Sequence, residues 1–211
     1  MMKDLRRLIY VPILHAREDS GRIASILHGN EKNDIKRGRI DKELSAVDEM
    51  WEGIAAKIEE LNLPWNQTRI YQDGVPVCGN ELEIITRLAE SGSPNFLFIL
   101  DLIQKKAKFE GTENIDLLIR EYDLLNKLLM KNSDKDRKET IAEYQVKSRE
   151  LLTVRDKFIL KRITSTLQKG ELPIVFMGVM HLLDKMLETD FLVSYVIYRL
   201  PFRSIGAIYN A

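Results

Sequence analysis

Continuous apolar runs and alternating patterns mark the strands that the chain is expected to form. Residues 8–14 and 174–177 are apolar throughout, which is typical of strands covered on both faces of a sheet. A shorter run at 68–72 ends at Asp73-Gly74, a turn signal. The predicted strands are 8–14, 68–72, 174–177 and 191–200, with 108–113 as an edge strand or a loop.

Apolar residues at a spacing of three and four mark the helices, which are predicted at 45–61, 80–90, 95–106, 114–131, 136–169 and from His181 to 188. Asn80 with Glu83 fits a capping box, and Asn114 fits an N-cap. The 136–169 helix has one wide apolar arc and an opposite polar face. The arc comprises Leu151, Leu152, Val154, Phe158, Ile159, Ile163 and Leu167, and the polar face comprises Thr153, Lys157, Lys161, Thr164 and Gln168.

The order of these elements is β-α-β, several helices, then β-α-β. This order predicts an α/β fold, with a small, mostly parallel central sheet flanked by helices and a helical middle insertion. We expect residues 1–211 to form a single domain. Within it, the segment 114–169 is expected to form a helical hairpin that projects and offers a surface for a homodimer.

Charge and cysteine content narrow the classes of partner. The chain has 32 basic and 32 acidic residues, so its charge offers no argument for binding nucleic acid or an anionic membrane. No apolar run approaches the roughly 20 residues of a membrane-spanning helix. Lys3, Arg6 and Arg7 before the first apolar run resemble a signal peptide, but Pro12 interrupts that run, so a strand is predicted. A single cysteine, Cys78, fits a reducing compartment, and the expected location is the cytoplasm.

Three charged residues fall inside the apolar arc of the 136–169 helix: Arg155, Asp156 and Arg162. An unpaired charge is costly in such a position. These residues are therefore expected either to pair, with Arg155–Asp156 as a structural ion pair, or to line a functional site.

Two of the three histidines follow predicted central strands. His15 comes after the first strand and His181 after Gly178, while His28 lies in a polar loop. Ligands bind at the carboxyl ends of strands in parallel α/β sheets, so neighbouring strands would bring His15 and His181 into one crevice. His181 and Asp184 would share one face of the last helix as an oriented base or as metal ligands, or be ordinary polar residues at a solvated helix start.

The combination of Arg155-Asp156, a helix, an apolar strand and Gly178-x-x-His181 resembles the C-terminal half of TraB/TIKI-like proteins. These belong to the erythromycin esterase/ChaN-like superfamily. His15 corresponds to the family's early histidine, although this chain reads Pro12-Ile13-Leu14-His15 where the family has Gly-Thr before the histidine and so a second GxxH.

The resemblance implies a hydrolase of a small-molecule or peptide substrate. In that reading His15 and His181 are bases or metal ligands, and Arg155 holds an oxyanion or a substrate carboxylate. Asp73, Glu113 or Asp156 would then orient a histidine or bind a metal. An open site of His15, His181 and Asp73 would suit Mn²⁺, Co²⁺ or Zn²⁺.

Simpler interpretations stand beside each of these roles. Asp73 fits a plain Asp-Gly turn, and Glu113 fits a carboxylate favoured at a helix entry. The alternative for the whole chain is a non-catalytic regulatory or scaffold protein that keeps the fold and binds a partner through its helical middle.

Overall fold

The computed structural model describes residues 5–14, 41–129 and 134–199. In chain order the elements are β1 (Arg6–Ile13), α2 (Asp41–Glu59), the 3-10 turn η1 (Trp65–Gln67), β2 (Thr68–Pro76), α3 (Glu81–Glu90), α4 (Pro94–Gln104), β3 (Lys108–Glu113), α5 (Ile115–Leu129), α6 (Asp134–Thr166), β4 (Leu172–Gly178), α7 (Leu183–Leu187) and β5 (Phe191–Tyr195). None of these helices is long and apolar enough to cross a membrane.

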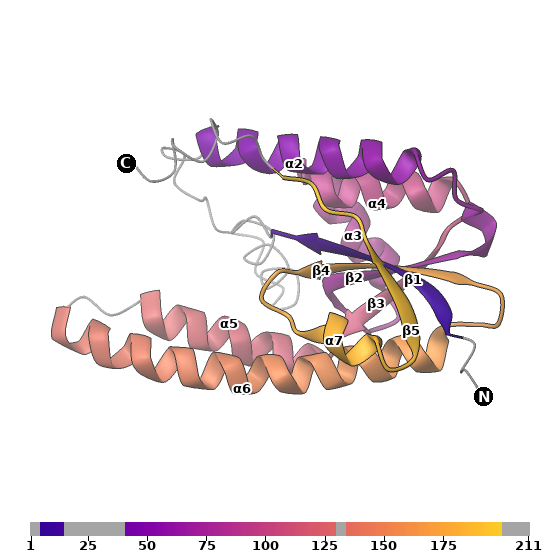
Figure 1. Ribbon diagram of the computed structural model, residues 1–211. Coiled ribbons are helices and arrows are strands. Elements are labelled where there is room, and N and C mark those ends of the chain that lie inside the picture. Colours follow the sequence, from indigo (N-terminus) through magenta and orange to yellow (C-terminus); the bar gives the residue numbers. More distant parts are fainter. Residues whose placement is uncertain (1–4, 15–40, 130–133, 200–211) are drawn as a thin grey trace.

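The five described strands form one sheet in the order β3-β2-β4-β1-β5 (Figure 1). Every strand pair in it is parallel. The register places Ile13 of β1 opposite Gly178 of β4, and Gln72 of β2 opposite Phe176. The predicted α/β fold with a parallel sheet is therefore confirmed, and 108–113 is an edge strand.

Helices cover the sheet on both faces, as Figure 1 shows, with α2 and α4 on one side and α6 on the other. Alternate residues of β1 explain why both faces are dry: Ile9 and Val11 pack toward α2, α3 and α4, whereas Leu8 and Tyr10 pack toward α6 and α7. Residues 174–177 and most of 8–13 are therefore buried as expected, whereas Leu14, predicted as the end of the first strand, lies beyond β1 and is 47% exposed.

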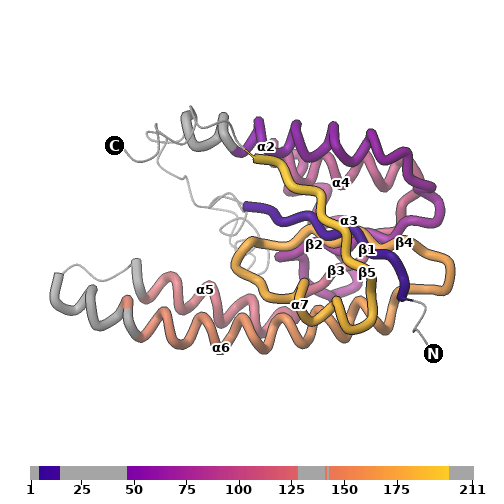
Figure 2. The backbone as a smooth tube through the Cα atoms, in the orientation of Figure 1, coloured from indigo at the N-terminus to yellow at the C-terminus, as the bar shows by residue number. Residues whose placement is uncertain are grey.

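Helices α5 and α6 run side by side as an antiparallel pair that extends beyond the edge of the sheet (Figures 1 and 2). The later part of α6 packs against the sheet, through Ile159, Ile163 and Thr166. Within the predicted arc Val154 is exposed, because it lies off the line of the residues that face the strands.

Strand β2 differs most from its prediction. It does not turn at Asp73-Gly74 but continues to Pro76, with an irregular register between Gln72 and Pro76. Gly74 has a φ of 82°, a conformation that glycine adopts at little cost. The Asp-Gly pair therefore serves a bulge inside the strand rather than a turn, and the plain-turn interpretation of Asp73 is wrong.

Two other local predictions are also wrong. Asn80 precedes α3 but makes no side-chain capping bond; instead Glu81 Oε1 accepts hydrogen bonds from the backbone N–H groups of Cys78 and Gly79. The last strand is shorter than 191–200 and ends at Tyr195. Asn114, by contrast, caps α5 as predicted, with Oδ1 accepting from the N–H groups of the two residues that follow Ile115.

Gly111 in β3 gives a first testable prediction, because its backbone lies against β2 at the bulge. A Cβ atom there would be 2.8 Å from the Pro76 carbonyl oxygen and 2.9 Å from Glu81 Cγ. We expect Gly111→Ala to lower the free energy of unfolding by about 1–3 kcal/mol, measured by urea denaturation. A change below about 0.5 kcal/mol, as at an ordinary surface position, would contradict this close packing.

Candidate functional site

The carboxyl ends of three adjacent strands bring ionisable side chains together. Asp73 lies in the bulged part of β2, Glu113 ends β3, and His181 follows β4 after Gly178. All three side chains are buried: Glu113 is 0% exposed, Asp73 2% and His181 7%. Their position agrees with the general rule that sites in parallel sheets form at the carboxyl edge.

Arg155 of α6 donates hydrogen bonds to three carboxylates in this cluster. Its Nε atom donates to Glu113 Oε2 at 3.0 Å, and its NH2 group donates to Glu113 Oε1 at 2.8 Å, which gives a two-point pair. NH2 also donates to Asp73 Oδ1 at 3.0 Å. The NH1 group donates to Glu121 Oε2 of α5 at 2.5 Å. One guanidinium therefore joins α5, α6, β2 and β3.

His181 lies between two carboxylates. Its Nδ1 atom is 2.5 Å from Asp156 Oδ1, and its Nε2 atom is 3.3 Å from Asp73 Oδ2. Backbone N–H groups hold both carboxylates in place: Leu182 donates to Asp156 Oδ2 at 3.1 Å, and Gly178 donates to Asp73 Oδ2 at 2.9 Å. The Asp156–His181 pair has the arrangement in which a carboxylate orients an imidazole.

The charged residues in the arc of α6 do not pair as one of the sequence interpretations has it. Adjacent on the helix, Arg155 reaches toward Glu113 and Asp73, while Asp156 reaches toward His181. The prediction of a structural ion pair between Arg155 and Asp156 is therefore wrong. Arg162 lies nearer the start of β3 and donates to Glu110 Oε2 at 2.5 Å and to the Gly111 carbonyl at 3.2 Å, outside the cluster.

The prediction that His181 and Asp184 share a helix face is also wrong. Helix α7 begins at Leu183, and His181 precedes it in a turn closed by its own N–H to the Gly178 carbonyl at 3.0 Å. This turn directs His181 inward, whereas Asp184 accepts a hydrogen bond from the Tyr195 hydroxyl at 3.1 Å. The imidazole is thus removed from solvent although its neighbour Met180 is exposed.

Burial and the charges of neighbouring side chains shift the pKa values of Glu113 and His181. Burial raises the pKa of Glu113 to about 7; the charge of Arg155 opposes this shift, and the charge of Asp73 reinforces it. Burial lowers the pKa of His181, but the charge of Asp73 and the hydrogen bonds to Asp156 and Asp73 outweigh it and raise the pKa to about 10. At neutral pH His181 is therefore an imidazolium that donates through both ring nitrogens.

Asp73, Glu113 and His181 form a group whose potential metal-ligand atoms lie within 4.8 Å of one another. Arg155, however, already takes both oxygens of Glu113 and Oδ1 of Asp73, while the Gly178 N–H and His181 Nε2 lie against Asp73 Oδ2. A catalytic metal site usually has three protein ligands, and the guanidinium would repel a divalent cation. The described residues therefore do not by themselves complete the predicted Mn²⁺, Co²⁺ or Zn²⁺ site, whose other predicted ligand, His15, lies outside them.

Comparisons with family models, with curated proteins and with solved structures gave no match. The resemblance to TraB/TIKI-like proteins thus rests on the short motifs alone and stays a proposal.

Of the residues predicted for a site, the structure brings together Asp73, Glu113, Arg155, Asp156 and His181. His15, together with His28, lies outside the described residues, although β1 and β4 are parallel neighbours as its predicted role requires. Sequence reasoning missed Glu121. It is one of several acidic residues on α5, and only the docking of α5 on α6 distinguishes it from the others.

Proposed function

We propose that this cluster is the active site of a hydrolase that acts by general acid–base catalysis without a metal. The observation that carries the proposal is the placement of His181, oriented at Nδ1 by Asp156 and facing Asp73 with Nε2. The hydrolase class is also what the TraB-like resemblance of Gly178-x-x-His181 implies.

The pKa of Glu113 lies below that of His181, so one group can accept a proton while the other donates one, as acid–base catalysis requires. With a pKa of about 7, Glu113 is a proton acceptor near neutrality, in contact with Asp73 through Arg155. With a pKa of about 10, His181 holds a proton at Nε2 under the same conditions. Two groups whose environments separate their pKa values are typical of an acid and a base acting in one reaction.

In the proposed reaction, Asp73, whose Oδ2 lies beside His181 Nε2, removes a proton from a water molecule and shares it with Glu113, and the water oxygen bonds to the carbonyl carbon of an ester or amide. His181 then donates its Nε2 proton to the leaving oxygen or nitrogen as the bond to the carbonyl carbon breaks. The proton taken up by the carboxylates returns to His181 through solvent, which restores the starting state. Asp156 keeps the imidazole in the orientation that this transfer requires.

Hydrolysis of p-nitrophenyl butyrate and of a thioester analogue tests this assignment. We expect His181→Asn to reduce the rate by about 10²–10⁴-fold, the usual contribution of a positioned acid or base. Glu83→Gln, a change at the exposed Glu83–Arg87 pair of α3, is the control and should leave the rate unchanged. The wild-type rate should rise as Glu113 loses its proton near pH 7, fall as His181 loses its proton near pH 10, and persist with a chelator.

A second candidate, a non-catalytic binding protein, is favoured by one observation. Each of the buried charged side chains Asp73, Glu113, Arg155 and Asp156 bonds to another member of the cluster, so the network can serve as a structural brace. A partner, or a second copy of the chain, would then use the α5–α6 hairpin, where Val146 and Val154 are exposed. Wild-type protein that hydrolyses none of the esters, thioesters or peptides offered would favour this candidate.

A further inference from the structure

Glu121 differs from the other carboxylates around Arg155. Glu113 and Asp73 are almost completely buried, and backbone or imidazole N–H groups hold Asp73 from other sides. The Glu121 side chain is 37% exposed and reaches inward from the surface of α5. It bonds to NH1, the end of the guanidinium that points away from Glu113 and Asp73.

Charge balance shows that the guanidinium does not need this third carboxylate. Asp73, which also faces the His181 imidazolium, and Glu113, which is partly ionised near neutral pH, already supply the negative charge that balances Arg155. A further carboxylate at NH1 gains a charge-assisted hydrogen bond but repels the other two. The net attraction between Glu121 and Arg155 is therefore weaker than their short hydrogen bond indicates. An ion pair that is partly exposed to water also contributes little to stability.

We propose that the NH1 end of Arg155 is a subsite for a substrate carboxylate, and that Glu121 is an internal occupant that the substrate displaces. The inference rests on the proposed hydrolase function and names its substrate class: an ester or amide that also carries a carboxylate group. The planar edge of a guanidinium is suited to a carboxylate, and a monoanion replaces Glu121 without changing the charge of the cluster.

The position of Glu121 also supplies the route of entry. Arg155 is 5% exposed and Glu121 is 37% exposed, so Glu121 is the partner of NH1 that solvent reaches. Rotation of this one side chain toward solvent exposes the donor without moving Glu113, Asp73 or the backbone. A phosphate dianion is disfavoured in the same position, since it would add charge beside two buried carboxylates.

Trifluoroacetate is a suitable probe, because it is a monocarboxylate that the protein cannot hydrolyse and that ¹⁹F NMR detects directly. We expect Glu121→Gln to bind it at least about tenfold more tightly than wild type, since an internal carboxylate no longer competes for the donor. Asp123→Asn is the matched control: the same change of charge on an exposed residue of the same helix. It should bind as wild type does, and the Arg155 Nε–H resonance of Glu121→Gln should shift on titration.

Equal binding by Glu121→Gln and wild type would overturn the proposal. An equal gain in Asp123→Asn, or binding without a shift at Arg155, would also overturn it, because either result indicates a general effect of net charge. The test does not depend on catalysis. Tighter binding in Glu121→Gln by a protein that hydrolyses nothing would retain the carboxylate subsite and reject the hydrolase.

Discussion

Replacing Arg155 with methionine should lower the free energy of unfolding by about 3–5 kcal/mol, the largest stability effect expected in this protein. The substitution removes the positive charge from two carboxylates that are almost completely buried, Glu113 and Asp73. Methionine fills much of the same volume, so the decrease in stability comes from the unpaired buried charges rather than from a cavity. Urea denaturation followed by circular dichroism measures the change.

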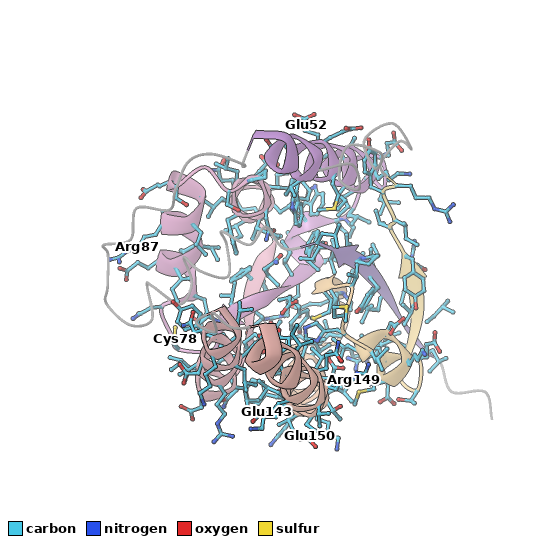
Figure 3. All side chains as sticks on the ribbon, turned by 90° about the vertical axis from the view of Figure 1, so that its left-hand side faces the viewer. Glu52, Cys78, Arg87, Glu143, Arg149 and Glu150 are labelled. Atoms are coloured by element: carbon cyan, nitrogen blue, oxygen red, sulfur yellow. The ribbon has the colours of Figure 1, made fainter. Side chains whose placement is uncertain are left out.

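Arg87→Met is the matched control for this experiment. Arg87 pairs with Glu83 one turn earlier on α3, and Figure 3 shows it at the surface of the molecule. Exposed pairs of this kind contribute about 0–1 kcal/mol. A loss in Arg155→Met no larger than in Arg87→Met would mean that water, not Arg155, balances the charge of Glu113 and Asp73. Adding Glu113→Gln to Arg155→Met should restore part of the loss, because an amide carries no charge to bury.

His181 should remain protonated at neutral pH and lose its proton near pH 10, which NMR of the labelled imidazole measures directly. The cause is its position between Asp73 and Asp156, whose charge and hydrogen bonds outweigh the cost of burying an imidazolium. A pKa at or below the ordinary value of 6.5 would contradict this arrangement and would leave Nε2 free to act as a base or as a metal ligand.

The same pKa difference sets the sign of a pH effect on stability. The folded-state pKa of His181 lies above its unfolded value of 6.5, so the folded protein holds the proton more tightly. The stabilisation is complete below pH 6.5 and is lost as the pH rises toward 10, by up to about 1.4 kcal/mol for each pH unit. Comparing urea denaturation of wild type and His181→Asn across this range isolates the contribution, because the variant lacks the titrating group.

Glu113 acts in the same direction over a lower range. Its folded-state pKa of about 7 exceeds the ordinary 4.5, so its contribution is complete below pH 4.5 and is lost as the pH rises through 7. The two groups together predict a protein whose stability declines from slightly acidic toward alkaline pH.

The sequence by itself determined the fold class and most of the elements, because both depend on local patterns. Apolar runs such as 174–177 are typical of strands covered on two faces, and helical spacing indicated most of the inner side of α6. The same patterns showed that Arg155 and Asp156 lie in an apolar environment, so the need for partners was evident before the partners were known.

Only the tertiary structure decided which partners these charges have. Arg155 and Asp156 are adjacent in sequence yet reach different groups, because consecutive helix residues point about 100° apart and here meet different strands of the sheet. Glu121 joins the cluster through the docking of α5 on α6, and His181 turns inward through a turn that precedes α7. Periodicity places a side chain on a face, but its contacts depend on how separate elements pack, and that packing is non-local.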